Sequence, residues 1–278
     1  DNTSKVTKYD NPNRTLTDPY EGQQLGEIWG YVVDGYFKTD EEARNYKVDQ
    51  SFVNQMINAS ALDNGLHAGD LKFVDLDGNN KIEQTTSAND RKDMKVIGNS
   101  LPRYNYNFGI SADWYGIDFS VLFQGIGKQN WYPGAETSMF WGPYSRPYAS
   151  FIPSDFMSQV WSEENTDAYF PRPRGYVALG SNRELAVVNT KYLQNLAYCR
   201  LKNLSIGYIL PDKWLSKIGF EKIRVYFSGE NLLTFTKLHS DYIDPEQASA
   251  SNSWKTSKSD ANIYPWAKTY SFGVDITF

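Results

Sequence analysis

The feature of this chain that most limits its possible folds is a strict alternation of apolar and polar residues. In the segment "TYSFGVDITF" (269–278), aromatic and aliphatic residues take every second position, and Ser, Gly, Asp and Thr take the positions between them. Successive side chains of a β-strand point to opposite faces of the sheet. The segment therefore predicts a strand with one apolar face and one polar face.

Four further segments show the same period of two. Residues 103–114 and 117–126 alternate on either side of Tyr115-Gly116, which predicts a hairpin with a tight turn. Residues 198–210 and 222–236 also alternate, and a weaker pattern near 2–9 predicts the end of one more strand. The sequence thus predicts about six strands that are consecutive along the chain.

Three residues break the alternation. Leu122 falls among the polar positions of its strand, and Arg200 and Lys202 fall among the apolar positions of theirs. The two cations indicate either a β-bulge, which shifts the phase by one residue, or a strand end that lies outside an apolar layer.

The connections between the predicted strands alternate between short and long. Residues 115–116 and 211–219 are short, and Pro211 opens about one helical turn in the second of them. The segments 10–102, 127–197 and 237–267 are long. Short turns on one side and long loops on the other are typical of outer-membrane β-barrels.

Alternation alone does not separate a barrel wall from a water-soluble sandwich that buries one face. Aromatic residues make up 15% of the chain, and several lie near predicted strand ends: Trp114, Trp214, Trp266 and Tyr270. Rings with a polar tip favour the boundary between lipid and water. Together with the loop asymmetry, they favour the barrel. The chain contains no run of about 18 apolar residues, so no transmembrane helix is expected.

The composition excludes several classes of function. The net charge of -5 provides no basic surface for nucleic acid. Cys199 is the only cysteine, and His67 and His239 are the only histidines, so a disulfide framework or a histidine-rich metal site is not expected. No phosphate-binding glycine pattern and no catalytic triad motif occurs, and we expect no enzyme.

Seven blocks of sequence resemble, in order and spacing, the C-terminal part of SusC/RagA-type TonB-dependent outer-membrane transporters. They are "LGEIWGYVVDGYF" (25–37), "GDLKFVDLDGNNKI" (69–82), "DRKDMKVIGNSLPRYNYNFGI" (90–110), "GIDFSVLFQG" (116–125), "YCRLKNLSIGYILPDKWLSKIGF" (198–220), "RVYFSGENLLTFTK" (224–237) and "YPWAKTYSFGVDITF" (264–278). The segment after Ile82, "EQTTSAN", is a few residues longer than the resemblance leads us to expect.

The resemblance implies an all-β fold, in which the chain supplies the C-terminal strands of an antiparallel transmembrane barrel of about 22 strands. Its long extracellular loops would carry short helices, as "TDEEARNY" (39–46) and "SDFMSQVW" (154–161) indicate. Residues 270–278 would form the final strand, with Phe278 as the signal for membrane insertion. Six strands are too few to close a barrel, so we expect the chain to be found with a missing N-terminal part that includes the signal peptide and the plug domain.

The resemblance also implies function and partners. The chain would belong to the bacterial outer membrane and take part in importing a bulky oligosaccharide or, alternatively, a peptide. A SusD-like surface lipoprotein would close over the long loops, and an inner-membrane TonB complex would supply the energy through the missing part. Two other functions remain open. A secreted carbohydrate-binding sandwich would be a water-soluble monomer, and a glycan-degrading enzyme would need a pair of carboxylates about 5–10 Å apart across a cleft.

A candidate calcium site lies in "DLDGNNKIEQ" (75–84). Asp75, Asp77 and Asn79 are spaced as in the first half of an EF-hand loop, where alternate oxygen ligands surround a hard cation. Asn80 stands where glycine is usual, and Thr86 stands where a bidentate glutamate is usual, so Asp90 is the expected distal ligand. The alternative is an Asp-Gly turn without an ion. Calcium would be a structural ion; no other cofactor is expected.

A candidate substrate site lies in "NWYPGAETSMFWGPYSRPYASF" (130–151). The rings of Trp131, Tyr132, Trp141 and Tyr144 are expected to stack on sugars, as aromatic side chains in concave sites do with apolar ring faces. The alternatives are packing between loops or contact with a partner protein, because interfaces are rich in the same residues.

Overall fold

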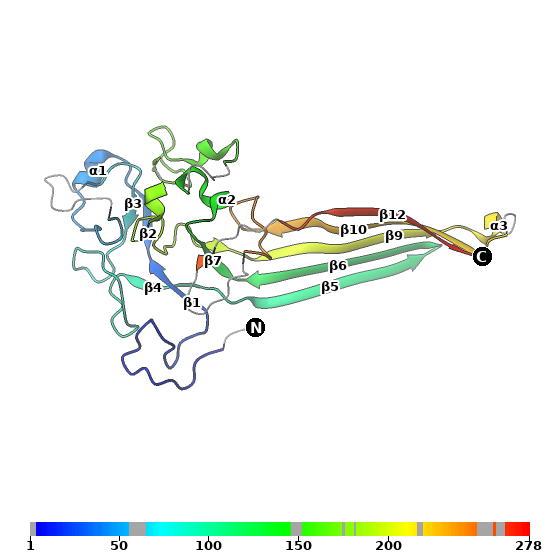
Figure 1. The fold of residues 1–278 in the computed structure, drawn as a ribbon, viewed down its shortest axis with the longest axis horizontal. Coiled ribbons are helices and arrows are strands. Elements are labelled where there is room, and N and C mark those ends of the chain that lie inside the picture. The colour runs from blue at the N-terminus through cyan, green and yellow to red at the C-terminus, as the bar shows by residue number, and fades with distance from the viewer. Residues whose placement is uncertain are drawn as a thin grey trace.

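The largest element of the fold is a five-stranded antiparallel sheet that extends from a head of loops (Figure 1). The computed structural model describes residues 4–55, 65–145, 152–173, 176–180, 182–215, 219–248, 258–259 and 265–278. The strands of the sheet, in spatial order, are β12 (Thr269–Thr277), β10 (Lys222–Thr236), β9 (Tyr198–Ile209), β6 (Ile117–Lys128) and β5 (Arg103–Trp114).

The strand limits coincide with the alternating segments to within two residues. The weak pattern near 2–9 is the exception. Among residues 4–9, Lys5 forms one isolated antiparallel bridge with Gln24, and no strand is present. Val6 and Tyr9 are the only apolar residues of the segment 2–9, and their spacing of three places them on opposite faces of a strand, so the pattern does not specify a ladder.

The two faces of the sheet differ in chemistry, although Leu122 and Tyr226 lie on the polar one. One transverse row joins Ala112, Phe119, Ile206, Phe227 and Phe272, one residue from each strand in register. The next row along the strands lies on the opposite face and consists of five serines, again one from each strand: Ser111, Ser120, Ser205, Ser228 and Ser271. The alternation of the sequence is therefore converted into an apolar face and a polar face that both cross the whole sheet.

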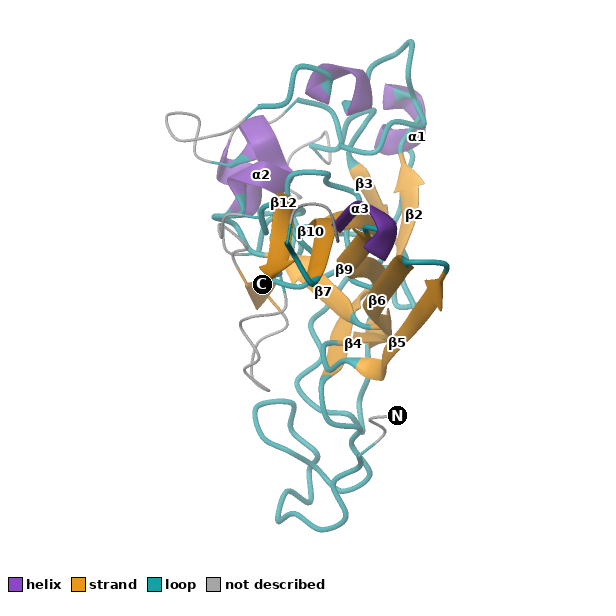
Figure 2. Ribbon diagram, turned by 90° about the vertical axis from the view of Figure 1, so that its right-hand side faces the viewer, coloured by secondary structure: helices purple, strands orange, loops and turns teal. Residues whose placement is uncertain are grey.

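The apolar face is open in the described part of the chain. Phe272 is 83% exposed, Val274 56% and Ile276 46%, so no second layer of described polypeptide covers the final strand. Viewed from the α3 end, the five strands follow one another in a single row (Figure 2). A sandwich would have buried these side chains against a second sheet. None of the helices in the described residues is both long and apolar enough to cross a membrane.

A β-bulge explains the misplaced cations of β9. Asn203 pairs with Leu122 and Leu201 pairs with Phe123, so Lys202 is one residue in excess on β9. The extra residue shifts the alternation of side chains between the two faces by one position. Arg200 therefore lies on the polar face, in register with Gln124. Of the two alternatives that the sequence left open, the register identifies the bulge.

Short connections join neighbouring strands of the sheet at the end opposite the head (Figure 1). Tyr115 and Gly116 both have positive φ values, 45° and 83°, as a two-residue hairpin turn of type I′ requires. The helix α3 (Asp212–Leu215) follows Pro211 and connects β9 to β10 at the same end. Trp114, Tyr115 and Trp214 are 62–88% exposed there and form a group of aromatic residues at this margin of the sheet.

The head consists of small sheets, short helices and long loops. Its strands are β1 (Glu27–Tyr31), β2 (Val33–Tyr36), β3 (Leu71–Phe73), β4 (Met94–Asn99), β7 (Asn130–Pro133), β8 (Gln194–Asn195) and β11 (Lys258–Ser259). Its helices are α1 (Asp40–Arg44), α2 (Ser138–Trp141), η1 (Gly142–Tyr144), η2 (Phe156–Gln159) and η3 (Tyr176–Leu179). β1 pairs with β4, β2 with β3, and β7 with both β8 and β11.

Both helices expected in the loops are present as single turns. Thr39 caps α1 by accepting a hydrogen bond from the Glu42 N–H at 3.1 Å, and the Glu42 carboxylate accepts from the Lys38 N–H at 2.9 Å. The helix expected at 154–161 is a 3-10 turn, η2, which buries Phe156. Among its described residues, the head has two hydrophobic clusters: a large core that contains Phe156 of η2, and a smaller cluster in which Ala43 of α1 packs with Phe37 and Leu66. The head therefore packs on its own apolar residues rather than on the five-stranded sheet.

Candidate functional site

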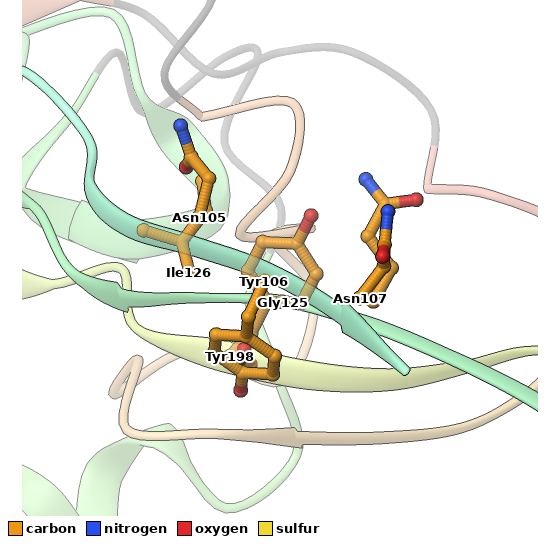
Figure 3. A pocket seen from close by; sticks show the side chains of 7 residues that line it. Asn105, Tyr106, Asn107, Gly125, Ile126 and Tyr198 are labelled. Carbon is orange, nitrogen blue, oxygen red and sulfur yellow. Dashed lines mark hydrogen bonds between the residues drawn. The ribbon is translucent and has the colours of Figure 1, made fainter. Parts of the chain in front are cut away.

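The polar face of the sheet carries amide and charged groups near the head. Asn107, Gln124, Arg200 and Thr234 form one transverse row, and the Arg200 Nε donates to the Thr234 Oγ1 at 2.9 Å. A cavity of about 400 Å³ lies beside this row and is lined by Asn105, Tyr106, Asn107, Gln124, Gly125, Ile126 and Tyr198. Figure 3 shows Asn105 and Asn107 extending from β5 to the same side. Carboxamides both donate and accept hydrogen bonds, so they suit hydroxyl or amide groups of a ligand.

A buried ion network holds a loop of the head against this row. Arg200 donates to Asp244 at 2.7 Å and to Glu246 at 2.6 Å, and Lys202 donates to Glu246 at 2.9 Å. The side chains of Arg200 and Asp244 are 3% and 5% exposed. The sequence alone does not reveal this network, and its only signal there is that Arg200 falls among the apolar positions of β9.

A second ion cluster ties the final strand to the sheet near the α3 end. Arg224 of β10 donates two hydrogen bonds to Asp118 of β6, at 2.6 and 2.8 Å, and one to Asp275 of β12 at 3.2 Å. Its side chain reaches Asp118 across Gly207 of β9, where a Cβ atom would collide with both partners. Both clusters lie on the polar face, and neither has the arrangement of a catalytic dyad, because each carboxylate is paired with a cation.

The aspartate loop brings three carboxylates together. One carboxylate oxygen each of Asp75, Asp77 and Asp93 lies within 4.8 Å of the others. Asp90 does not join them: its N–H donates to the Ser87 carbonyl in a turn, and its carbonyl accepts from the Thr85 hydroxyl. Asp93, eighteen residues after Asp75, occupies the place for which Asp90 was expected. Asp93 is three residues farther along the sequence than Asp90, at the far end of the loop that follows Ile82.

Backbone donors organise this loop. Asp75 accepts from the N–H groups of Gly78 and Asn80 at 2.7 Å, and the Asn79 side-chain oxygen accepts from the Lys81 N–H at 2.8 Å. Asn80 adopts the left-handed conformation with φ 63°, as its place in the motif requires. Partial burial acts to raise the pKa of Asp75, but the N–H donors hold it below its usual value.

Asp93 differs from the other two aspartates because it is fully buried. Burial raises its pKa, and the nearby charges of Asp77 and Asp75 act in the same direction. Three like charges at this separation repel one another, and a bound cation would relieve the repulsion. The arrangement is therefore compatible with calcium, whose usual ligands are oxygens.

The four rings expected to bind substrate are all buried in the head. Trp131, Tyr132, Trp141 and Tyr144 are at most 3% exposed. Their polar tips are also engaged: the Tyr132 hydroxyl donates to the Leu185 carbonyl at 2.8 Å, and the Trp141 Nε1 donates to the Gly134 carbonyl at 3.0 Å. The rings therefore correspond to the alternative of packing between loops. Stacking on a sugar would require the core of the head to open.

Comparisons with known proteins give one consistent result. No family model matches the chain. The chain is 28% identical over 264 residues to TonB-dependent receptor P3 of Formosa agariphila and 26% identical over 283 residues to TonB-dependent receptor P39 of the same organism. Both matches cover 93% of this chain, which spans only 22% and 25% of the length of those two relatives.

Solved structures support the fold. Structures named as the RagAB peptide importer in an open-open state and as the RagAB peptide transporter superpose with TM-scores of 0.53 and 0.55. They are 20% and 19% identical to this chain and cover 97% and 98% of it, and the chain covers 24% of each. The resemblance to SusC/RagA-type TonB-dependent transporters is thus confirmed. These relatives are named as receptors and importers, in agreement with the expectation that the chain is not an enzyme.

Proposed function

We propose that this chain forms a stretch of the barrel wall and the outer loops of a TonB-dependent importer in the outer membrane of a bacterium. The observation that carries the proposal is the open apolar face, which crosses all five strands while serines cross the opposite face. Acyl chains of lipid solvate such a face, and a polar lumen suits the other. A strand of 12 residues, tilted about 40°, spans roughly 30 Å, enough for the apolar layer.

The imported nutrient is, on this proposal, a bulky oligosaccharide. The amide row at Asn107 and Gln124 supports it, since carboxamides hydrogen-bond to sugar hydroxyls. A peptide is the second candidate, because the similar solved structures are named as a peptide importer and carboxamides bond equally well to peptide groups. We further propose a SusD-like surface lipoprotein as the partner of the head, and a plug and a TonB complex that act through the remainder of the protein.

Uptake by cells tests this function. A strain that lacks the gene should grow normally on simple sugars and fail on one oligosaccharide or peptide from a panel, and the intact gene should restore growth. The protein should partition with outer-membrane vesicles and change its gel mobility on heating, as folded barrels do. A water-soluble gene product, or normal growth of the deletion strain on every member of the panel, would contradict the proposal.

We also propose that Asp75, Asp77 and Asp93, with Asn79, hold a structural calcium ion. Titration of the full-length protein with calcium should release or absorb heat, with a dissociation constant in the range of about 10⁻⁶ to 10⁻³ M. Asp93→Asn should weaken binding by at least about tenfold, because it removes one of the converging charges. Asp90→Asn is the matched control and should change nothing. Equal effects of the two variants, or no heat at millimolar calcium, would contradict a site at these residues.

A further inference from the structure

A second cavity lies in the head, apart from both the polar face of the sheet and the aspartate loop. Its volume is about 630 Å³, within the range of 300–1,000 Å³ that is usual for small-ligand sites. Its lining includes Lys38, Thr39 and Asp40 at the start of α1. This helix lies in the head, at the end of the molecule opposite α3 (Figure 1). We call the cavity the α1 cleft and define it by its lining: Lys38, Thr39, Asp40, His67, Ala68, Trp161, Glu163 and Arg172.

Close backbone packing builds the floor of the α1 cleft. Gly69 has φ 82°, and a Cβ atom there would lie 2.6 Å from the ring of Trp161 and 2.8 Å from the Cβ of Arg172. The Gly69 N–H donates to the Phe37 carbonyl at 2.8 Å, and its carbonyl accepts from the Arg172 N–H at 3.0 Å. Three segments that are distant in the sequence are thereby held together, and the position of Arg172 is fixed by the backbone.

The guanidinium of Arg172 is fixed by a buried carboxylate. Its Nε donates to the carboxylate of Asp70, which is completely buried, while the Arg172 side chain remains 31% exposed. Among the described residues, no acceptor contacts its two terminal amino groups. An arginine fixed in this way presents a preorganised fork, and a carboxylate is the group that such a fork binds with two parallel hydrogen bonds.

The other charges of the α1 cleft favour the same ligand. Lys38 is exposed, and its ammonium has no ion-pair partner among the described residues. Asp40 is already engaged, since it accepts from the Ala68 N–H at 2.9 Å and lies 3.8 Å from both His67 and Arg44. The cationic donors of the α1 cleft that have no acceptor among the described residues therefore come from Arg172 and Lys38, and Glu163 is the exposed acid in the same lining.

We propose that the α1 cleft binds a carboxylate group of the imported oligomer, through the fork of Arg172 and the ammonium of Lys38. The inference rests on the proposed importer function and deepens it, because it restricts the nutrient to oligomers that carry acidic groups. Two sources share this chemistry: an oligosaccharide of uronic acids, and a peptide with acidic side chains or a free C-terminus. The carboxylate of Glu163 repels additional negative charge and so disfavours ligands that carry several acidic groups close together.

Calorimetry on the full-length gene product in detergent tests the proposal. The probes are a short oligogalacturonate and a glutamate-containing peptide, each beside its neutral counterpart, a maltooligosaccharide and the glutamine peptide with blocked termini. One acidic probe should bind, its neutral counterpart should not, and added salt should weaken binding because the attraction is partly screened. The identity of the acidic probe that binds distinguishes the two sources.

Variants connect the binding to the named residues. Arg172→Gln should weaken binding of the acidic probe by about 10- to 100-fold, the effect of losing hydrogen bonds between charged groups. Arg172→Lys should weaken binding of the acidic probe nearly as much, because lysine keeps the charge but cannot form two parallel hydrogen bonds to a carboxylate. Lys38→Gln, at an exposed position outside the packed core, should weaken binding by about 3- to 10-fold, and Glu163→Gln should strengthen it.

Three results would overturn the proposal: neither acidic probe binds, acidic and neutral probes bind equally, or Lys38→Gln and Glu163→Gln leave the affinity unchanged. The last comparison remains informative even if changes at Arg172 disturb folding through the buried Asp70. If cells still take up the nutrient but calorimetry gives one of these three results, the carboxylate site is refuted and the proposed importer function is not.

Discussion

Replacing Arg200 by methionine is expected to destabilise the protein by about 3–5 kcal/mol, the usual cost of leaving a buried charge without its partner. Arg200 is 3% exposed and contacts both Asp244 and Glu246. Methionine fills a similar volume, so the loss arises from two carboxylates that remain in a site poor in water. Denaturant unfolding in detergent measures the global effect, and trypsin cleavage after Lys237 measures the release of the loop that follows β10.

Two control variants separate this effect from general damage. Lys202→Met removes a neighbouring cation whose side chain is 19% exposed, and it should cost less than about 1.5 kcal/mol. The double variant Arg200→Met with Asp244→Leu should recover a large part of the loss, because replacing both members of a buried pair by apolar residues is often neutral. If Arg200→Met costs no more than Lys202→Met, the ion network does not hold the loop to the sheet.

The second large effect concerns two adjacent residues of β12. Phe272→Arg is expected to destabilise the protein in a lipid bilayer by about 2–4 kcal/mol, because a cation near the midplane of the apolar layer must leave water. Ser271→Arg, one residue away on the polar face, should cost about 1 kcal/mol or less, since in the proposed barrel its side chain would extend toward the lumen. Phe272 is 83% exposed in this chain, so loss of packing contributes little to the difference.

Refolding into bilayers, followed by denaturant titration, measures both variants. A water-soluble protein with an open face would tolerate Phe272→Arg as well as Ser271→Arg, because an arginine on either face would be hydrated. Equal costs for the two variants would therefore contradict the assignment of the apolar face to lipid.

The sheet could be predicted from the sequence because its determinants are local. The alternation in 103–114 and 117–126, with Tyr115-Gly116 between them, specifies both strands, their register and the turn without any distant residue. The bulge at Lys202 was one of two alternatives, because a phase shift and a strand end produce the same local pattern. Only the pairing with Leu122 and Phe123 separates them.

The head could not be predicted in the same way, because its structure depends on contacts between distant segments. Trp131 and Tyr144 lie in a segment of mixed composition, and nothing near them in the sequence indicates that they share a core with Phe170, Leu185 and Tyr192. Asp93 was missed because the spacing rule of the calcium motif fails when the loop is longer. Arg172 was missed because Asp70, which positions it, lies 102 residues away.

The extra residue at position 202 has a consequence for how this chain tolerates changes in length. Deleting it would move Tyr198 and Arg200 from the polar face of the sheet to the apolar face and separate Arg200 from Asp244 and Glu246. A single lost codon would thus leave a charge without its partners on the face that we propose to contact lipid. A loop of the head, by contrast, gains several residues at a cost of only about 0.6 kcal/mol for each doubling of its length. Insertions and deletions should therefore accumulate in the head of homologous proteins, and peptide tags for imaging should be placed there rather than in β9.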